Sequence, residues 1–555
     1  MPTAIVTIAL LLLTITPLAA QPDPIIVGRV GNSQGAPVQG VQVRAFPLSA
    51  PEAIALTETQ PDGRYALPLK RPLPAALSIE FRRPHFTTGR HDLSGEQMSF
   101  LNSSNPVVLL NATLPRHRGV AFWLTTILFL SMLVMMAVGK THNTLAAMIA
   151  TAGLFGVSYI GRLFRDDLYI IDFVDAVRFI DWNVVFLIMG MMIVIAIVER
   201  TGIFQWLALR SFEISKGRLK ILLPVLMLVT GVTSAFLDNI TTMLLMTPIT
   251  IQICLALGIH PFTFLMPEIF AANVIGISTL VGTPTNILIG SYARISFNDF
   301  LLNLTPGVLL SFAGLIGYCL FIYRDELNKG VTISEDLLDH LRERARITEP
   351  EHLRKAGWVG LGMLVLFVFG EYAHLLPSVT ALMGATAMLA WIEPDVEEMI
   401  EAVDWTTLVF FICLFMVVGS IQEVGLIAVI ADGISWAVGK SLILAMLAVL
   451  WAGALLSTVI ANIPFTASML PVIGYLTGSI PGAESKALFY CLSVGSAMGG
   501  NGSLIGASAN MVTAGISERA GYPITYLYFL KKGFPALLVT VSLATIWLLI
   551  RFIVF

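Results

Sequence analysis

The chain has 555 residues; 56% of them are hydrophobic, only 12% are charged, and the net charge at pH 7 is −3. A soluble protein carries about 25% charged residues, so the composition excludes a soluble fold, and the near-neutral charge argues against nucleic-acid binding. Apolar runs of about 17 to 25 residues, each long enough to cross a bilayer, recur from Gly119 to the C-terminus. The sequence therefore predicts an all-α polytopic membrane protein whose partner is the lipid bilayer.

Residues 1–20 form an apolar segment of signal-peptide length that ends in Ala19-Ala20, before the polar Gln21. The first residues include no Lys or Arg, so the segment is either a signal peptide or an uncleaved first span. Both interpretations place the residues that follow outside the cytoplasm.

Residues 24–114 differ from the rest of the chain because short alternating stretches are separated by Gly and Pro. The stretches "IIVGRVGNSQGAPVQGVQV", from Ile25, and "QPDGRYALPL", from Gln60, predict strands joined by turns, and hence a small extracytoplasmic β-sandwich. Their spacing resembles the carboxypeptidase-regulatory-like domains of exported proteins. The alternative is a generic β-module that binds no ligand.

Apolar segments read as full spans on both sides of a hydrophilic, cytoplasmic linker, 324–355. Five lie in the first region, 119–323, at 119–139, 144–161, 182–199, 266–296 and 305–323. Five lie in the second region, 356–555, at 356–374, 377–392, 405–423, 486–520 and 533–554. The fourth span of each set is interrupted by Gly, Asn and Ser. Each region also holds a broken apolar segment, 219–257 or 441–474, which we interpret as a re-entrant hairpin.

The two regions are repeats of one another, here called repeat 1 (119–323) and repeat 2 (356–555). The sequence "DWNVVFLIMG" from Asp181 matches "DWTTLVFFIC" from Asp404, and the broken segments match at the same offset of 223 residues. Such self-similarity indicates a duplication. Because five spans is an odd number, repeat 2 must be inverted in the membrane, as in many secondary transporters. Counted from residue 119, one side holds 16 Lys and Arg against seven on the other, which predicts a cytoplasmic linker.

The broken segments carry polar residues at membrane depth. The first reads "SAFLDNITTMLLMTP" from Ser234, and the second reads "STVIANIPFTASMLP" from Ser457. A carboxylate such as Asp238 costs roughly 2.5 to 3.5 kcal/mol in hydrocarbon, so we expect it to be a cation ligand or a proton carrier at the first hairpin tip. The alternative is a structural carboxylate that caps the N–H groups freed at the tip.

The interrupted spans supply the other half of each predicted site. Their motifs are "GTPTN", from Gly282, and "GGNGSLIGASAN", from Gly499, and each is expected to face the hairpin tip of its own repeat. Unwound backbone is tolerated at membrane depth only where it lines a protein-buried or watery cavity. Its oxygens suit Na⁺, while half-helix N-termini suit an anion. Packing of small residues between helices is the alternative.

The two half-sites are expected to meet near the midplane of the membrane. Glu268 precedes the first motif and is a candidate for proton relay, with a span-end residue near water as the alternative. The sequence offers no metal cluster and no nucleophile–base pair, so we expect no metal site, no cofactor and no enzymatic activity. The candidate ion- and substrate-binding residues are Ser234, Asp238, Asn239, Thr241, Gly282, Thr283, Asn286, Ser457, Asn462, Thr466, Asn501, Ser503, Gly506 and Asn510.

The four motifs, the last followed by "GISERAGY", resemble the ion-transporter superfamily over about residues 119–555. This group includes arsenite permeases, Na⁺/H⁺ antiporters, citrate-transporter-like proteins and the melanocyte P protein, and the resemblance is greatest to the P-protein branch. It implies a homodimer with a scaffold and a moving transport domain, an elevator motion, and cation sites at the hairpin tips. Dicarboxylate carriers of the group have Ser-Asn-Thr at each tip. The tips here read Asp238-Asn239-Ile240 and Ala461-Asn462-Ile463, which argues against dicarboxylate transport.

The sequence thus predicts an ion-coupled secondary transporter of an inorganic ion or small anion, citrate-transporter-like, with elevator-type alternating access. Na⁺ or H⁺ is the expected coupling ion, and the inner or plasma membrane is the expected location. Two alternatives stay open: a passive anion channel of the same fold, and a membrane-anchored sensor that uses the β-domain. An anchor has no need of duplicated broken helices, which disfavours the sensor.

Overall fold

The computed structural model describes residues 22–33, 35–103, 106–329 and 346–554. It divides the chain into two units, Met1–Trp123 and Leu124–Phe555. The predicted signal peptide or first span, 1–20, and the middle of the predicted linker, 330–345, lie outside the described residues.

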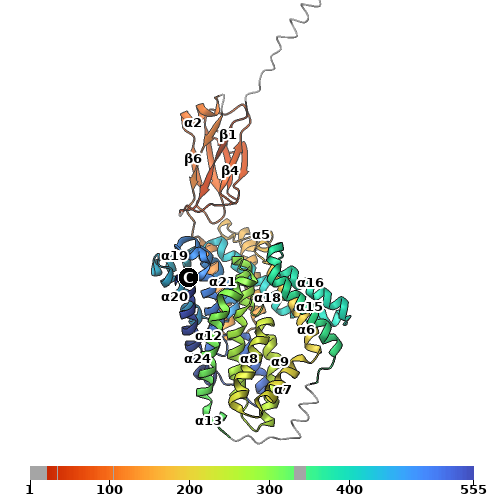
Figure 1. Ribbon diagram of the computed structural model, residues 1–555. Coiled ribbons are helices and arrows are strands. Elements are labelled where there is room, and N and C mark those ends of the chain that lie inside the picture. The colour runs from red at the N-terminus through yellow and green to blue at the C-terminus, as the bar shows by residue number, and fades with distance from the viewer. Residues whose placement is uncertain (1–21, 34, 104–105, 330–345, 555) are drawn as a thin grey trace, which may run out of the picture. The chain divides into compact units, whose positions relative to one another are not determined.

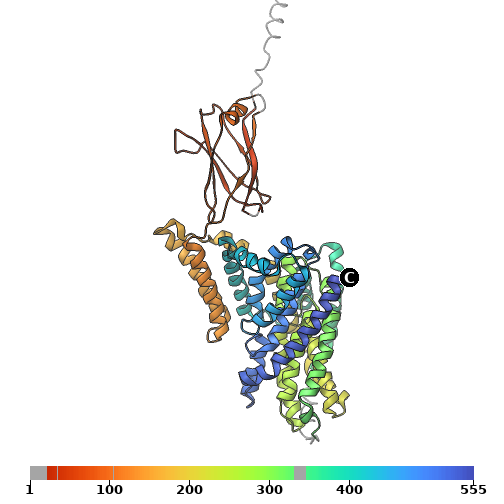
Figure 2. The same ribbon diagram turned by 90° about the vertical axis from the view of Figure 1, so that its left-hand side faces the viewer.

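The first unit is a sandwich of two four-stranded sheets (Figures 1 and 2). One sheet has the order β4-β1-β7, with β8 also paired to β1, and the other has the order β3-β2-β5-β6. The predicted N-terminal β-domain is therefore present. Its strands are β1 (Ile25–Gly31), β2 (Gln42–Pro47), β3 (Ala55–Glu58), β4 (Arg64–Pro68), β5 (Leu77–Arg82), β6 (Gly89–Asp92), β7 (Val107–Leu109) and β8 (Ala112–Thr113), and a short helix, α2 (Gly95–Leu101), precedes β7.

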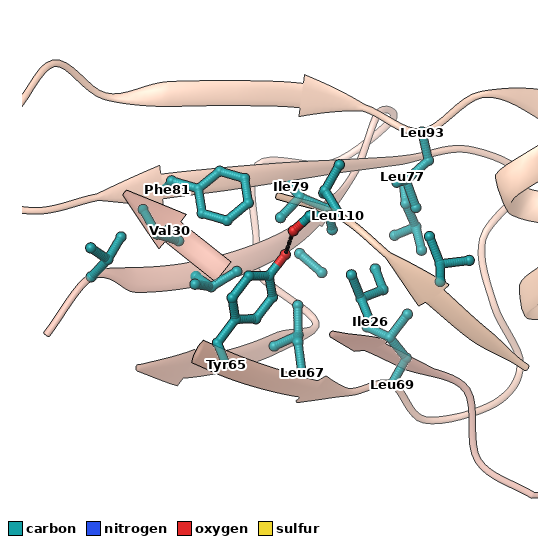
Figure 3. Packing of buried hydrophobic residues seen from close by; sticks show 14 of the residues in the cluster. Ile26, Val30, Tyr65, Leu67, Leu69, Leu77, Ile79, Phe81, Leu93 and Leu110 are labelled. Atoms are coloured by element: carbon teal, nitrogen blue, oxygen red, sulfur yellow. Dashed lines mark hydrogen bonds between the residues drawn. The ribbon is translucent and has the colours of Figure 1, made fainter. Parts of the chain in front are cut away.

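Alternate residues of these strands point inward and fill the space between the sheets (Figure 3). Ile26 and Leu67 are fully buried, and burying such a side chain contributes about 1.5–3 kcal/mol. The Tyr65 hydroxyl donates a hydrogen bond to the Leu110 carbonyl at 2.7 Å. Burial raises the pKa of Tyr65 well above its ordinary value, so the phenol stays a donor at physiological pH. The unit closes its core with its own residues.

The second unit is mostly helical. Within its described part, nine helices are long and apolar enough to cross a membrane, which makes the protein a multi-pass integral membrane protein. The helices of repeat 1 are α3 (Val120–Val138), α4 (Asn143–Phe155), α5 (Phe173–Arg178), α6 (Trp182–Arg200), α7 (Ile203–Ser215), α8 (Leu219–Phe236), α9 (Asn239–Ala256), α10 (Phe262–Ile275), α11 (Pro284–Ala293) and α12 (Phe297–Ile322). After α13 (Arg324–Leu327), those of repeat 2 are α15 (Pro350–Phe369), α16 (Pro377–Ile392), α17 (Val396–Glu401), α18 (Trp405–Val424), α19 (Leu426–Val438), α20 (Leu442–Leu456), α21 (Asn462–Ser479), α22 (Ala487–Gly499), α23 (Ser508–Arg519) and α24 (Tyr526–Leu549).

The last helix of each repeat begins earlier than the predicted spans 305–323 and 533–554. α12 begins at Phe297 and α24 at Tyr526, and each continues through an internal proline, Pro306 or Pro535. Membrane helices tolerate such prolines because neighbouring groups satisfy the freed carbonyl. The two helices pack side by side (green and dark blue in Figure 2), and the Trp547 indole N–H donates to the Asn303 carbonyl at 2.7 Å.

Each broken apolar segment folds into two helices joined by a short tip. α8 and α9 lie next to one another and meet at Leu237-Asp238 (Figure 1), while α20 and α21 are joined by 457–461. The 18 residues of α8 span about 27 Å at 1.5 Å per residue, close to the roughly 30 Å hydrocarbon core. Length alone therefore permits either a re-entrant hairpin or two full crossings. Both return the chain to its starting side, so the orientation of the other helices does not depend on the choice.

The equivalent helices α6 and α18 run in opposite directions. Arg200, at the C-terminal end of α6, forms an ion pair with Glu398 of α17, which immediately precedes α18. At the other end, Gly419 in the C-terminal half of α18 packs against the ring of Phe179, just before α6. Each helix therefore begins where its counterpart ends.

Candidate ion-binding site

The interrupted spans unwind at the positions of the predicted motifs. In repeat 1, α10 is followed by the short turn η4 (Gly276–Ser278) and an extended stretch that leads to α11. In repeat 2, α22 is followed by η7 (Gly500–Gly502) and a similar stretch that leads to α23. Each unwound segment lies against the hairpin tip of its own repeat, as the contacts below establish.

Ser234 holds the first hairpin tip to α10, and Ser457 holds the second tip to α22. The Ser234 hydroxyl donates to the Ala272 carbonyl at 3.1 Å, and the Ser457 hydroxyl donates to the Ser496 carbonyl at 2.6 Å. Both serines are fully buried. Because donors and acceptors occupy equivalent positions, the duplication has kept the same hydrogen bond in both repeats.

Gly282 and Gly506 allow the unwound segments to approach the tips closely. A Cβ atom at Gly282 would lie 2.8 Å from the Ser234 carbonyl oxygen, and one at Gly506 would lie 2.9 Å from the Ser457 carbonyl oxygen. Real Cβ atoms essentially never come this close to a backbone oxygen. The predicted pairing of Ser234 with Gly282 and of Ser457 with Gly506 is thus a backbone contact in both repeats.

A hydroxyl group closes each contact from the unwound segment. Ser503 donates to the Thr458 carbonyl, and Thr279 donates to the Ala235 carbonyl in the equivalent geometry. Ser503 is one of the predicted site residues, whereas Thr279 was missed. Superposition of the two motifs would have identified it, because Thr279 aligns with Ser503.

Asn286 and Asn510 brace the unwound backbone from inside. The Asn286 amide nitrogen donates to the carbonyls of Ile277 and Thr279 at 2.9 and 2.8 Å. The Asn510 amide nitrogen donates to two carbonyls of its own interruption at 2.7 and 2.9 Å. Both side chains are fully buried. They satisfy carbonyl groups that an unbroken helix would have satisfied internally.

Asparagine side chains also join the two repeats at their centre. Asn273 of α10 donates to the side-chain oxygens of Asn501 and Asn510 at 2.9 and 3.1 Å. Its own oxygen accepts from the Asn239 amide at the first hairpin tip, at 2.7 Å. Sequence reasoning missed Asn273, although an Asn in the apolar run "FLMPEIFAANVIG" was a visible signal.

A second bond crosses between the repeats in the other direction. The Ser493 hydroxyl of α22 donates to the Asn286 side-chain oxygen at 2.5 Å. Each bracing asparagine is therefore held by a polar side chain of the opposite repeat. We call these residues the asparagine cluster: Asn239, Asn273, Asn286, Ser493, Asn501 and Asn510. Four of them were predicted as site residues, and Asn273 and Ser493 were not.

Asp238 caps the first turn of α9. One carboxylate oxygen accepts the backbone N–H groups of Ile240 and Thr241, both at 2.9 Å, and the other accepts the Thr241 hydroxyl at 2.7 Å. The side chain is half-buried. The geometry is that of the capping alternative, and it also leaves the carboxylate at the edge of a cavity.

The remaining candidates are distributed around the two tips. Thr283 caps α11 by accepting the Asn286 N–H at 3.3 Å. At the second tip, the Asn462 N–H donates to the Gly506 carbonyl at 3.3 Å. The Thr466 hydroxyl is buried without a hydrogen-bond partner. Thr283 thus lies at the start of α11, and Asn462 and Thr466 lie in the first turns of α21, next to the second tip.

Glu268 lies deeper, among three helices of repeat 1. It is fully buried, which is incompatible with a span-end residue in contact with water. One carboxyl oxygen accepts hydrogen bonds from Thr230 of α8 and Thr250 of α9, each at 3.1 Å. The other oxygen, Oε2, is buried without a partner.

A cavity of about 320 Å³ opens beside the first tip. It is lined by Asp238 and Thr241 of the tip, by Pro284 of the first motif, and by Glu199 and Asp404. Its lining includes three carboxylates and no Lys, Arg or His among the described residues. An acidic cavity of this kind favours a cation over a free anion.

A second cavity, of about 430 Å³, is lined by equivalent residues at the opposite ends of α6 and α18. Glu199 and Asp404 of the first cavity correspond by the repeat offset to Gln422 and Asp181 of the second. The second cavity also includes Arg178 in its lining. The two cavities are therefore lined by equivalent positions of the repeated sequence but differ in charge. In the described part of the chain, no group of three or more His, Cys, Asp or Glu could hold a metal ion.

Known proteins provide an independent comparison. Residues 131–488 match the citrate transporter family, CitMHS. An uncharacterized transporter of Mycobacterium tuberculosis is 33% identical over 422 residues, which cover 76% of this chain and 96% of the relative. The human P protein is 29% identical over 491 residues, which cover 74% of this chain and 58% of that protein. Among solved structures, the YdaH transporter of Alcanivorax borkumensis aligns with a TM-score of 0.49 and 14% identity, covering 77% of this chain and 97% of that one.

Proposed function

The chain belongs to the citrate transporter family CitMHS, and from that premise we propose that it is an ion-coupled secondary active transporter of an inorganic ion or a small anion. One observation carries the proposal beyond the family. Two hairpin tips and two unwound helices make matched contacts, and the asparagine cluster joins them. Unwound backbone at membrane depth lines cavities in transporters, and an anchor or sensor has no use for it.

Alternating access follows from inverted repeats in this proposal. The opposite directions of α6 and α18 and the equivalence of the two cavities support the inversion. One cavity would admit the ion from one face of the membrane, and the other from the opposite face, as the tips and unwound segments move as one body. A homodimer with an elevator motion is part of the proposal and rests on the resemblance to the superfamily.

The coupling ion, Na⁺ or H⁺, is proposed to bind at the tips. Asp238 borders the acidic cavity, and oxygens of Ser234, Asn239 and Thr241 lie at the same tip. A cation that enters the cavity would meet the carboxylates of Glu199, Asp238 and Asp404. The bound cation would then offset the negative charge of Asp238, which would lower the free-energy cost of a carboxylate at this depth.

A flux screen in proteoliposomes tests the function. The purified chain is reconstituted, and Na⁺ or pH gradients are imposed against chloride, arsenite, citrate and tyrosine. We expect one of these to accumulate against its own gradient. Flux that only equilibrates would instead assign the passive channel of the same fold, and absence of all flux would contradict both.

The proposed orientation has its own test. We propose the inner or plasma membrane, with the linker cytoplasmic and residues 24–114 outside. A single Cys at Asn328, in a variant free of other cysteines, should resist an impermeant thiol reagent in intact cells. Rapid labelling would reverse the topology.

Deletion of 24–114 should leave flux intact, because both repeats lie beyond this domain. Loss of flux in a deletion variant that still inserts correctly into the membrane would make the β-domain part of the pathway.

A further inference from the structure

Glu268 is a buried carboxyl group that the proposed tip sites do not use. It connects three helices of repeat 1, since Thr230 of α8 and Thr250 of α9 both donate to its Oε1 atom at 3.1 Å. The residue is fully buried, and none of the described residues is a hydrogen-bond partner of Oε2. The group therefore has two donors for one oxygen and none for the other.

The surroundings of Glu268 provide no counter-charge. Within the described residues it forms no ion pair, and the titratable group within its electrostatic reach is the Cys254 thiol of α9. No charged residue occurs in α22, η4 or η7. On the other elements packed against α10, the charged residues lie within two turns of a helix end: Lys220 of α8, Asp238 at the start of α9, Asp299 of α12, Glu518 and Arg519 of α23, and Lys531 and Lys532 of α24.

The protonated acid fits this environment better than the carboxylate. A carboxylate buried at membrane depth without a counter-charge loses its hydration with no ionic partner to offset the loss. A neutral acid leaves only one O–H group without an acceptor, which is the smaller penalty. The two threonine hydroxyls can remain donors to Oε1 in both forms, so the site can hold or lose a proton without rearrangement.

A polar stripe leads from the first hairpin tip toward Glu268. Asn239, Thr242 and Thr250 occupy positions i, i+3 and i+11 of α9, which lie on one face of a helix. All three are buried, and the Thr242 hydroxyl has no hydrogen-bond partner among the described residues. Hydroxyl groups both donate and accept, so this face carries polar groups both at the tip and beside Glu268, and about 12 Å of helix separates Thr242 from Thr250.

Repeat 2 lacks both the acid and the stripe. The residues equivalent to Thr242, Thr250 and Glu268 are Phe465, Ile473 and Leu492. The hydrogen bonds that fix the tips are the same in both repeats, so the structural part of the duplication does not require these polar residues. Their presence in repeat 1 points to a task that repeat 2 does not perform.

We propose that Glu268, held by Thr230 and Thr250, is a second proton-binding group of the transporter, separate from the cation site at the hairpin tips, and that it has no counterpart in repeat 2. The inference rests on the proposed transport function and adds to it a buried group that exchanges protons. A proton from water forms an O–H bond on the carboxyl group when the first tip is open to one face. That bond breaks when the tip is open to the other face, and the proton returns to water there.

Two measurements on the reconstituted full chain test this site without a transported substrate. Infrared difference spectra across a pH series should contain the C=O band of a protonated carboxylic acid that disappears at alkaline pH. The band should be missing from Glu268→Gln, which keeps the size and hydrogen bonding of the side chain. Steps of pH on a supported membrane should displace charge in the wild type, and this signal should be lost in Glu268→Gln.

Control variants separate a proton site from a structural contact. Glu371→Gln, at an exposed position, should keep both signals. Thr250→Val keeps the carboxyl group and should move the pH at which the band disappears, because it removes a donor to Oε1. If Glu268→Gln fails to fold, Thr250→Val replaces it as the test of the site. A band and a charge displacement that are the same in the wild type and Glu268→Gln, or absent from the wild type, would overturn the inference. The flux screen stands apart: flux with normal pH dependence in Glu268→Gln refutes this site alone, and no flux in the wild type refutes the proposed function.

Discussion

At the first hairpin tip the chain has Asp238, and at the equivalent position of the second tip it has Ala461. Around these two positions the backbone contacts are the same. A serine holds each tip, a glycine receives it, and a hydroxyl of the unwound segment bonds to the next carbonyl. The two repeats therefore share a framework of backbone contacts, whereas the tip carboxylate Asp238 and the buried Glu268 occur in repeat 1 and have Ala461 and Leu492 as their equivalents.

This difference has a physical basis. Contacts to backbone carbonyls depend on chain geometry, which a duplication copies as a whole. A second acid would add a second buried charge, which costs free energy unless a cation or a proton accompanies it. One repeat can therefore hold the ionisable groups while the other serves as its structural counterpart, and substitutions can test each part of this division.

The largest effect is expected from Gly282→Ala. The new Cβ would meet the carbonyl oxygens of Ser234 and Ala235 at 2.8 and 2.9 Å, and that of Gly276 at a shorter distance. Overpacking of this kind costs about 1–3 kcal/mol or more, and here backbone must move. The melting temperature of the purified protein should fall sharply and flux should be lost.

The counterpart Gly506→Ala should destabilise less, because its shortest contact would be 2.9 Å, to the Ser457 carbonyl oxygen. Gly515→Ala in α23 is the matched control, since nothing lies within 4 Å of its new Cβ. If all three variants melt together, the close approach at the tips has no energetic weight and the shared framework is not what holds them.

The second largest effect on stability and flux is expected from Asn273→Leu. It leaves the side chains of Asn239, Asn501 and Asn510 each short of a buried hydrogen bond, at about 1–3 kcal/mol for each unsatisfied group. Thermal melting and flux should both be impaired. Asn298→Leu, which removes one bond to the Val368 carbonyl, should have a smaller effect on both. Equal effects would mean that the asparagine cluster does not join the repeats.

The framework could be predicted from the sequence because the duplication marks it twice. Ser234 with Gly282, and Ser457 with Gly506, occur at matching offsets within two similar apolar runs. The β-domain was predictable from its alternation, which has a period of two residues. Helix starts were less predictable, since α12 and α24 continue through prolines that usually mark an end.

The contacts between the repeats could not be predicted in the same way. Asn273 has Ala497 as its equivalent, so comparison of the repeats gives no signal for it. Its role depends on how α10 packs against repeat 2, which is a matter of three-dimensional arrangement. Asp238 posed a different problem, because a carboxylate at a tip suits both a helix cap and a cation ligand.

Asp238 variants separate these two roles and should have an intermediate effect. Asn is as good an N-cap as Asp, whereas Ala costs about 0.5–2 kcal/mol at this position. We therefore expect Asp238→Asn to melt like the wild type but to lose the dependence of flux on pH or Na⁺. Asp238→Ala should lose stability as well.

Ala461→Asp sharpens the same test from the other repeat, because it adds a second acid tip to an otherwise equivalent framework. We expect it to change the number of coupling ions per transported ion, measured from the reversal potential in proteoliposomes. If Asp238→Asn keeps an unchanged dependence on both pH and Na⁺, Asp238 is a cap only and the coupling role is wrong.

The smallest effect is expected from exchanging the charges of the two cavities. Glu199 lines the acidic cavity and Gln422 is its equivalent in the second. Glu199→Gln removes one of three carboxylates from the cavity lining; in a high dielectric, a charge several ångströms away is worth somewhat under 1 kcal/mol. The half-saturating concentration of the coupling cation should rise about threefold, a change that corresponds to roughly 0.7 kcal/mol, while the maximal rate and the melting temperature stay constant.

The reciprocal Gln422→Glu should lower that half-saturating concentration only when the cation is added from the opposite face. Equal effects from both faces would mean that the two cavities do not serve as separate entrances, and alternating access through them would have to be abandoned.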